Sequence, residues 1–156
     1  MSFLNSVLKV FVGDKSKQDV KATMPLVNEI KSFESALEAL SHDELRGKTV
    51  AFKAKIAEAR KDIEDKITAL QNEADTSEDI DRKEDIYKEI DSLKDESYKV
   101  TEDVLNDILP EAFAVVKETA KRFVHNTNIT VQATTYDREL SGEKDYITLE
   151  GDNATW

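Results

Sequence analysis

The sequence predicts a mainly α-helical protein whose middle part is a long antiparallel coiled-coil hairpin. Only four Gly and two Pro occur in 156 residues, which favours long helices over turn-rich β structure. Apolar residues recur at intervals of three and four through most of the chain, as they do on one face of a helix. Alternating β-branched residues occur only near the C-terminus and predict a small β-hairpin there.

The composition excludes several classes of protein. With no Cys, the chain can form no disulfide and no thiolate-ligated metal site. No apolar run approaches the length of about 18 residues that a membrane span requires, and the start does not resemble a signal peptide, so we expect a cytoplasmic protein. The net charge of −11 is concentrated in residues 42–110, with twelve basic and twenty acidic side chains. Such an acidic region repels phosphate backbones, and we expect no nucleic-acid partner.

Residues 1–41 are expected to form an amphipathic helix, a charged link and a second helix. Residues 2–12 are largely apolar with a narrow polar stripe, and Gly13 is a natural C-terminal end for this helix. Residues 14–21 form the charged link, and Pro25 either starts or kinks the second helix. The apolar positions of that second helix are Leu26, Ile30, Phe33 and Leu37.

The N-terminal helix is the segment with the clearest candidate binding surface. It has two interpretations. Either it docks on the second helix and buries Leu4, Leu8 and Phe11, or it enters a membrane interface, where nearby lysines would contact anionic lipid. The candidate membrane or partner contacts are Phe3, Leu4, Val7, Leu8, Lys9 and Phe11, with Lys15, Lys17 and Lys21 following them.

Residues 42–109 are predicted to form an acidic hairpin of two helices. Ser41 and Glu44 have the spacing of a capping box and start a helix that is expected to end near Glu73. A polar loop over residues 74–79 follows, in which Thr76 or Ser77 could cap the next helix. The two apolar stripes are Phe52, Ile56, Ala59, Ile63, Ile67 and Leu70 in the first helix and Ile86, Ile90, Leu93, Ser97, Val100 and Val104 in the second. Each stripe of about 30 residues would extend about 45 Å.

Residues 110–124 predict a separate packing helix, and residues 125–156 a β-hairpin. Pro110 suits the first position of a helix, where its missing N–H has no partner in any case. One face of this helix carries the candidate core-packing residues Phe113, Val116, Ala120 and Phe123. The expected hairpin pairs residues 128–136 with residues 146–150 through a turn at residues 141–143.

No catalytic constellation is found in the sequence. Residues 45–49, Leu-Arg-Gly-Lys-Thr, end like a phosphate-binding loop but lack its first Gly and fall within a predicted helix. His42 and His125 lie 83 positions apart, which argues against a shared metal site. Residues 75–81 superficially resemble a calcium loop, but Ile80 stands where the tight turn needs Gly. We therefore expect no catalytic, cofactor-binding or metal-binding residue in this chain.

Three stretches nevertheless resemble a known family. They are Phe3-Leu4-Asn5-Ser6-Val7-Leu8-Lys9-Val10-Phe11-Val12-Gly13, Leu40-Ser41-His42-Asp43-Glu44-Leu45-Arg46-Gly47-Lys48-Thr49 and Leu109-Pro110-Glu111-Ala112-Phe113-Ala114-Val115-Val116-Lys117-Glu118-Thr119-Ala120-Lys121-Arg122-Phe123. In this order they resemble the N-terminal region of SecA, the ATPase motor of bacterial protein export. The resemblance covers residues 1 to about 124, whereas the acidic extension around residues 60–105 and the segment from His125 onward look like insertions.

The resemblance implies a function for a longer parent protein. SecA proteins bind ATP and Mg²⁺ through motifs that follow this region, and they push preproteins through the SecYEG channel. They act at the inner face of the cell membrane and contact anionic phospholipid. By this resemblance the chain is a scaffold and contact segment that precedes the ATP-binding core and is inactive alone. Phe113, Val116, Ala120 and Phe123 would then pack on that core, and we expect the isolated chain either to self-associate or to cover this stripe with its C-terminal hairpin.

One alternative comes from a different class of protein. A free-standing helical coiled-coil interaction protein without enzymatic activity would have the same periodicity. Only the amino-acid identities in the three stretches favour the translocase. A small hydrolase lacks support, because the sequence offers no nucleophile, base or phosphate loop.

Overall fold

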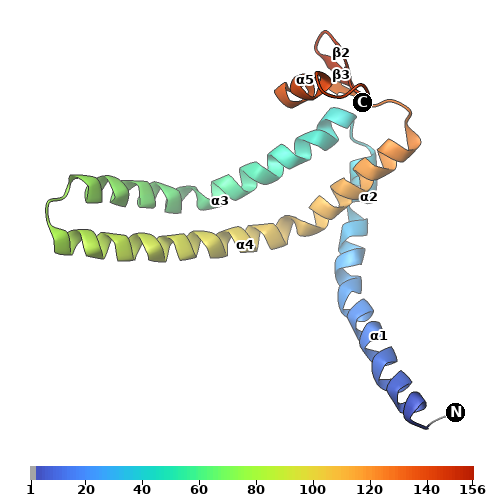
Figure 1. Cartoon of the computed structure of the whole chain (residues 1–156), viewed down its shortest axis with the longest axis horizontal. Helices are drawn as coiled ribbons and strands as arrows, with labels where there is room; N and C mark the ends of the chain where they lie inside the picture. The colour runs from blue at the N-terminus through green and yellow to red at the C-terminus, as the bar shows by residue number, and fades with distance from the viewer. Residues whose placement is uncertain (1–2) are drawn as a thin grey trace. The chain divides into compact units, whose positions relative to one another are not determined.

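The computed structural model describes the backbone of residues 3–156 and the side chains of residue 15 and residues 17–156. The chain divides into two compact units, one formed by Ser41–Ala112 and one by Met1–Leu40 with Phe113–Trp156. The elements are α1 (Phe3–Ser32), α2 (Glu34–Glu38), α3 (His42–Thr76), α4 (Ile80–His125), β1 (Thr130–Gln132), α5 (Thr135–Ser141), β2 (Thr148–Glu150) and β3 (Asn153–Thr155) (Figure 1). The predicted fold class, mainly α with a hairpin of strands at the C-terminus, is confirmed.

Helix α3 begins with the predicted capping box. The backbone N–H of Glu44 donates to Ser41 Oγ at 3.2 Å, and the backbone N–H of Ser41 donates to Glu44 Oε2 at 2.7 Å. This second hydrogen bond lowers the pKa of the Glu44 carboxyl below its usual 4.5. Two N–H groups that have no partner within the helix are thereby satisfied, which fixes where α3 starts.

The Ser41–Ala112 unit is held together by an apolar seam between α3 and α4, which lie side by side and antiparallel (Figure 1). Its buried residues are Ile63, Ile67, Ala74, Ile86 and Ile90, with Leu70, Leu93 and Val100 packed against them. Burying an isoleucine side chain stabilises a fold by about 1.5–3 kcal/mol, so a few such residues suffice to pair the helices. The predicted coiled-coil hairpin is confirmed.

The turn between the two helices is shorter than predicted. Helix α3 continues to Thr76, because Ala74 is 1% exposed and extends the seam by one more turn. The predicted cap at Thr76 or Ser77 is wrong. The side chain of Asp79 accepts instead from the backbone N–H groups of Asp81 at 3.0 Å and Arg82 at 3.2 Å, and so caps α4.

Helix α4 does not start at Pro110, as the sequence predicted, but runs through it. A proline inside a helix removes one hydrogen bond and costs about 3 kcal/mol. Here both Pro110 and Ile108 are buried. Their burial offsets the lost bond, and the predicted boundary between two helices becomes the interior of one.

A polar layer interrupts the seam at Ser97, which is 4% exposed. The Nε–H of Arg60 donates to Ser97 Oγ at 2.9 Å, and the Ser97 hydroxyl donates to Glu64 Oε1 at 3.1 Å. The hydrogen bond from Arg60 also lowers the pKa of the Glu64 carboxyl. A buried hydroxyl with both partners satisfied costs little, and it favours the one register in which those partners meet.

In the other unit, α1 is a single helix, so the predicted end at Gly13 and the charged link over residues 14–21 are wrong. Glycine costs a helix about 1 kcal/mol, which good helix formers on either side can offset. Pro25 lies inside α1, which ends at Ser32. After Phe33 the short helix α2 follows and buries Leu37.

The C-terminal part of this unit is a three-stranded antiparallel sheet in the order β1-β3-β2. One face aligns Val131, Ala154 and Leu149 across the strands, and Ile129 and Trp156 complete the small core. The two strands that the sequence paired do not contact each other, because β3 lies between them. Helix α5 replaces the end of the predicted first strand.

Two local signals explain this difference. Thr134 and Asp137 form a second capping box, which starts α5 where the sequence analysis had continued a strand. Gly151, with φ of 60°, turns the chain directly from β2 into β3. A glycine in that conformation suits the first central position of a two-residue hairpin loop. The observed hairpin is therefore β2–β3.

Candidate functional site

The C-terminal part of α4, residues 113–125, has two opposite faces. One face is buried and comprises Ala114, Val115, Glu118 and Arg122. The other is exposed and comprises the predicted core-packing residues Phe113, Val116, Ala120 and Phe123. At about 100° per residue, the centres of these two sets lie on opposite sides of the helix.

The buried face is organised around Arg122, whose side chain keeps only 10% of its surface exposed. Its Nε–H donates to Glu118 Oε1 at 2.9 Å, and Nη2 donates to the backbone carbonyls of Leu37 at 3.0 Å and Leu40 at 2.8 Å. These carbonyls end α2 and the turn after it. One guanidinium therefore caps a helix C-terminus and pairs with a carboxylate at once.

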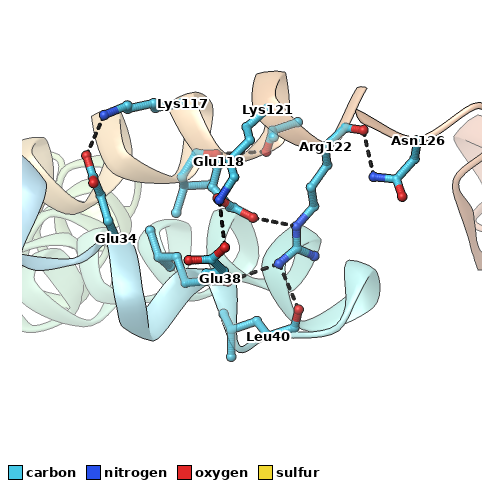
Figure 2. Close-up of polar contacts among 11 residues, drawn as sticks. Glu34, Glu38, Leu40, Lys117, Glu118, Lys121, Arg122 and Asn126 are labelled. Carbon is cyan, nitrogen blue, oxygen red and sulfur yellow. Dashed lines mark hydrogen bonds and ion pairs between the residues drawn. The ribbon is translucent and has the colours of Figure 1, made fainter. Parts of the chain in front are cut away.

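Two exposed ion pairs flank this buried contact, so that Figure 2 shows a row of α4 side chains reaching α2. Lys117 binds Glu34, and Lys121 Nζ lies 2.8 Å from Glu38 Oε1. The hydrogen bond from each lysine lowers the pKa of its carboxyl partner, and the hydrogen bond to Glu38 raises the pKa of Lys121. We call Glu34, Glu38, Lys117, Glu118, Lys121 and Arg122 the charged clasp.

The sequence analysis identified the apolar face of this helix but missed the charged clasp. Phe113 and Phe123 are each 54% exposed and Val116 is 67% exposed, so the C-terminal sheet does not cover them. The packing of these residues on a further domain stays a prediction. The missed signal was a glutamate and an arginine four positions apart, Glu118 and Arg122, next to the apolar pair Ala114 and Val115.

The predicted contacts at the N-terminus are Phe3, Leu4, Val7, Leu8, Lys9 and Phe11, whose side chains lie outside the described residues. Farther along α1, the side chains of Lys15, Lys17 and Lys21 are exposed. So is every other described side chain up to Pro25, including Val20 and Met24. This part of α1 is covered by no other described element.

The stretch that resembles a phosphate loop lies within α3, where its backbone N–H groups belong to the helix. Lys48 Nζ is held by Glu111 Oε1 at 2.8 Å. His125 is the exposed last residue of α4. Among the described residues, no group of three or more His, Asp or Glu could hold a metal ion, and no helix is both long and apolar enough to cross a bilayer.

Comparison with known proteins identifies the family. A family model described as the SecA DEAD-like domain matches residues 8–142. The chain belongs to the SecA family. It is 68% identical over 156 residues to the protein translocase subunit SecA of Christiangramia forsetii and 56% identical over 156 residues to that of Flavobacterium psychrophilum. The SecA of Porphyromonas gingivalis strain ATCC 33277 is 40% identical over the same length.

These SecA relatives are much longer proteins. Each alignment covers 100% of this chain but only 14% of the relative, so the chain corresponds to an N-terminal segment of SecA. The likeness also extends past residue 124, where the sequence analysis had placed its limit, because these relatives match residues 125–156 as well. No solved structure matches the chain.

The charged clasp predicts that Arg122 is needed for the stability of its unit. Arg122→Gln removes the closer cation from the buried Glu118 carboxylate, which keeps Lys121 Nζ at 3.6 Å, and should cost about 3 kcal/mol in the free energy of unfolding, measured by urea denaturation. Lys117→Gln removes only an exposed pair and should change it little. The double variant Glu118→Gln/Arg122→Gln should recover part of the loss. Equal stability of the Arg122→Gln and Lys117→Gln variants would contradict the assignment.

The clasp also predicts a pH dependence. Because the pKa of Glu38 and of Glu34 lies below the usual 4.5, their contribution is present above pH 4.5 and is lost as pH falls through the lowered values. The pKa of Lys121 lies above 10.5, so its contribution is lost only at more alkaline pH. Thermal unfolding midpoints from about pH 7 to about pH 3 should therefore fall less steeply for Glu34→Gln/Glu38→Gln than for the unchanged chain. Parallel curves would rule out this role.

Proposed function

We propose that this chain is the scaffold and contact segment of an ATP-dependent preprotein translocase. Its relatives carry the name protein translocase subunit SecA, and the whole of this chain aligns with them. Their greater length leaves room for the ATP-binding core, because the chain spans only 14% of each. The parent protein would drive preproteins through the SecYEG channel.

In this proposal ATP and Mg²⁺ bind elsewhere in the longer protein. The residues of this chain do not fit the nucleotide, since the one stretch that resembles a phosphate loop lies inside α3 and its lysine pairs with Glu111. A phosphate-binding loop needs free backbone N–H groups and a lysine that can reach the phosphates. The chain would act on the nucleotide only through the way it positions the core.

The observation that carries the proposal is the exposed stripe of Phe113, Val116, Ala120 and Phe123. The charged clasp fixes the opposite face of the same helix against α2, so the stripe points away from its own unit. A row of large apolar side chains on a rigid helix is typical of a surface that another element covers. We assign that element to the ATP-binding core of the same protein.

The second part of the proposal concerns α1 and localisation. The described side chains of α1 up to Pro25 are exposed, and a helical stretch of this kind gains little stability from packing within its own unit. Lys15, Lys17 and Lys21 are exposed on the described part, and Lys9 precedes them. Lysines next to apolar residues suit the interface of a membrane with anionic phospholipid. The protein would thus be cytoplasmic and bind peripherally at the inner face of the membrane, where the channel lies.

The exposed stripe gives a differential test. In the isolated chain, Phe113→Ser/Phe123→Ser changes two exposed residues and should leave the free energy of unfolding within about 0.5 kcal/mol. In the intact translocase the same change should lower preprotein-stimulated ATP hydrolysis by about tenfold, because the two rings then lie in an interface. Tyr136→Ser, at a residue 59% exposed, is the matched control. Full activity of the double variant in the intact protein would refute the assignment of the stripe.

Helix α1 is tested with lipid vesicles. Deleting residues 1–12 and replacing Lys15, Lys17 and Lys21 by Gln should abolish flotation with anionic vesicles, since both apolar anchoring and charge attraction are removed. Vesicles of zwitterionic lipid serve as the control and should bind neither form. If the altered protein still floats with anionic vesicles, α1 is not the membrane contact.

A further inference from the structure

The part of α4 within the Ser41–Ala112 unit carries a second apolar stripe, separate from the seam. Its large exposed apolar side chains are Ile80 at 80%, Tyr87 at 54%, Tyr98 at 65%, Leu105 at 45% and Leu109 at 37%. They follow one another at intervals of 7, 11, 7 and 4 residues. On a helix with about 3.6 residues per turn, these intervals return to nearly the same angle, so all five lie within about 40° of arc.

This outer stripe is not a continuation of the α3–α4 core. The seam residues Ile86 and Ile90 are at most 2% exposed and lie roughly a quarter turn or more away from it. Helix α3, in contrast, exposes only Val50 among its large apolar residues. A helix with two apolar stripes of helical period has one stripe for its present neighbour and one for another helix.

Acidic side chains, like exposed apolar ones, are more numerous on α4 than on α3. Helix α3 carries seven basic and eight acidic side chains, whereas residues 80–112 of α4 carry five basic and eleven acidic ones. The carboxylates of Glu84, Asp95 and Glu102 form one flank of the outer stripe, and Asp91 lies at the edge of the stripe itself. Glu84 and Asp91 pair with Lys88 and Lys94, but Asp95 and Glu102 form no ion pair within the described chain.

The middle of the outer stripe borders a hollow. A shallow groove between α3 and α4 is lined by Thr68, Gln71, Lys94, Tyr98 and Thr101, among others. Tyr98 thus stands between this groove on one side and the carboxylates of Asp95 and Glu102 on the other. The other lining residues are mostly polar, so the apolar contact that this region offers comes from the Tyr98 ring.

The acidic side chains beside the outer stripe decide which kind of partner can bind to it. A membrane with anionic lipid and a nucleic acid would both be repelled by the carboxylate flank. A second copy of the chain would bring two units together that each carry twelve basic and twenty-one acidic residues. A helix with lysine or arginine beside its apolar face would meet the carboxylates of Asp95 and Glu102 and could place a cation on a tyrosine ring.

We propose that the outer stripe of α4 is the docking site for a basic amphipathic helix of a separate protein. The partner's apolar residues pack on Tyr87, Tyr98 and Leu105, and its cations pair with Asp95 and Glu102. The stripe begins at Ile80, directly after the loop at the end of the hairpin. This role is independent of the scaffold role proposed above.

The test uses the full 156-residue chain and a labelled 18-residue helical peptide of leucine and lysine, with fluorescence anisotropy as the readout. Tyr87→Ser/Tyr98→Ser/Leu105→Gln should weaken binding by about tenfold or more. Asp95→Asn/Glu102→Gln should weaken it clearly more than Asp62→Asn/Asp65→Asn, which removes the same charge from α3. Tyr98→Ser alone serves if the triple variant loses helical structure in circular dichroism.

The other possible partners of the outer stripe correspond to results that contradict the proposal. Equal weakening by the two charge variants, with no effect of the stripe variants, would show charge attraction without a docking site and overturn the proposal. Sedimentation that reveals a dimer lost in Tyr98→Ser would assign the stripe to a second copy. Flotation with anionic vesicles that depends on Tyr98 would assign it to the membrane. A peptide with glutamate in place of lysine should not bind.

Discussion

The apolar seam between α3 and α4 is the interaction on which the Ser41–Ala112 unit depends. Ile63, Ile67, Ile86 and Ile90 are at most 7% exposed and form its core together with Ala74. A two-helix hairpin has little interior, so each buried isoleucine contributes a large share of the stability. The seam also sets the rotation of α4, and it therefore decides which of its residues face outward.

The polar layer at Ser97 favours one alignment of the two helices along the seam. An apolar seam with a regular repeat tolerates a shift of one helix along the other by whole turns. The hydrogen bonds of Ser97 with Arg60 and Glu64 exist in only one alignment, so a shift would leave a buried hydroxyl unsatisfied. A modest loss of apolar burial thus favours a single register, and with it a single set of exposed residues.

The other unit is stabilised by a different balance of forces. Between α2 and α4 few large apolar side chains are buried, and Arg122 makes the central contact with backbone carbonyls and Glu118. The exposed ion pairs beside it, Lys117–Glu34 and Lys121–Glu38, depend on pH and salt, whereas the apolar contacts of the seam carry no charge.

The sequence by itself determined the family, the mainly helical fold, the capping box at Ser41 and the α3–α4 hairpin. These follow from the spacing of apolar residues and from the amino-acid identities of short stretches. It did not determine that the helices continue through Gly13 and Pro110, because a local preference of about 1–3 kcal/mol is outweighed by neighbours and burial. It also could not pair the strands, since β3 is too short to give a pattern and its place depends on the turn at Gly151. Only the tertiary structure decided which stripe of α4 is covered and which faces outward. Periodicity places apolar residues on one face of a helix, but the partner that covers that face lies elsewhere in the chain or in another protein.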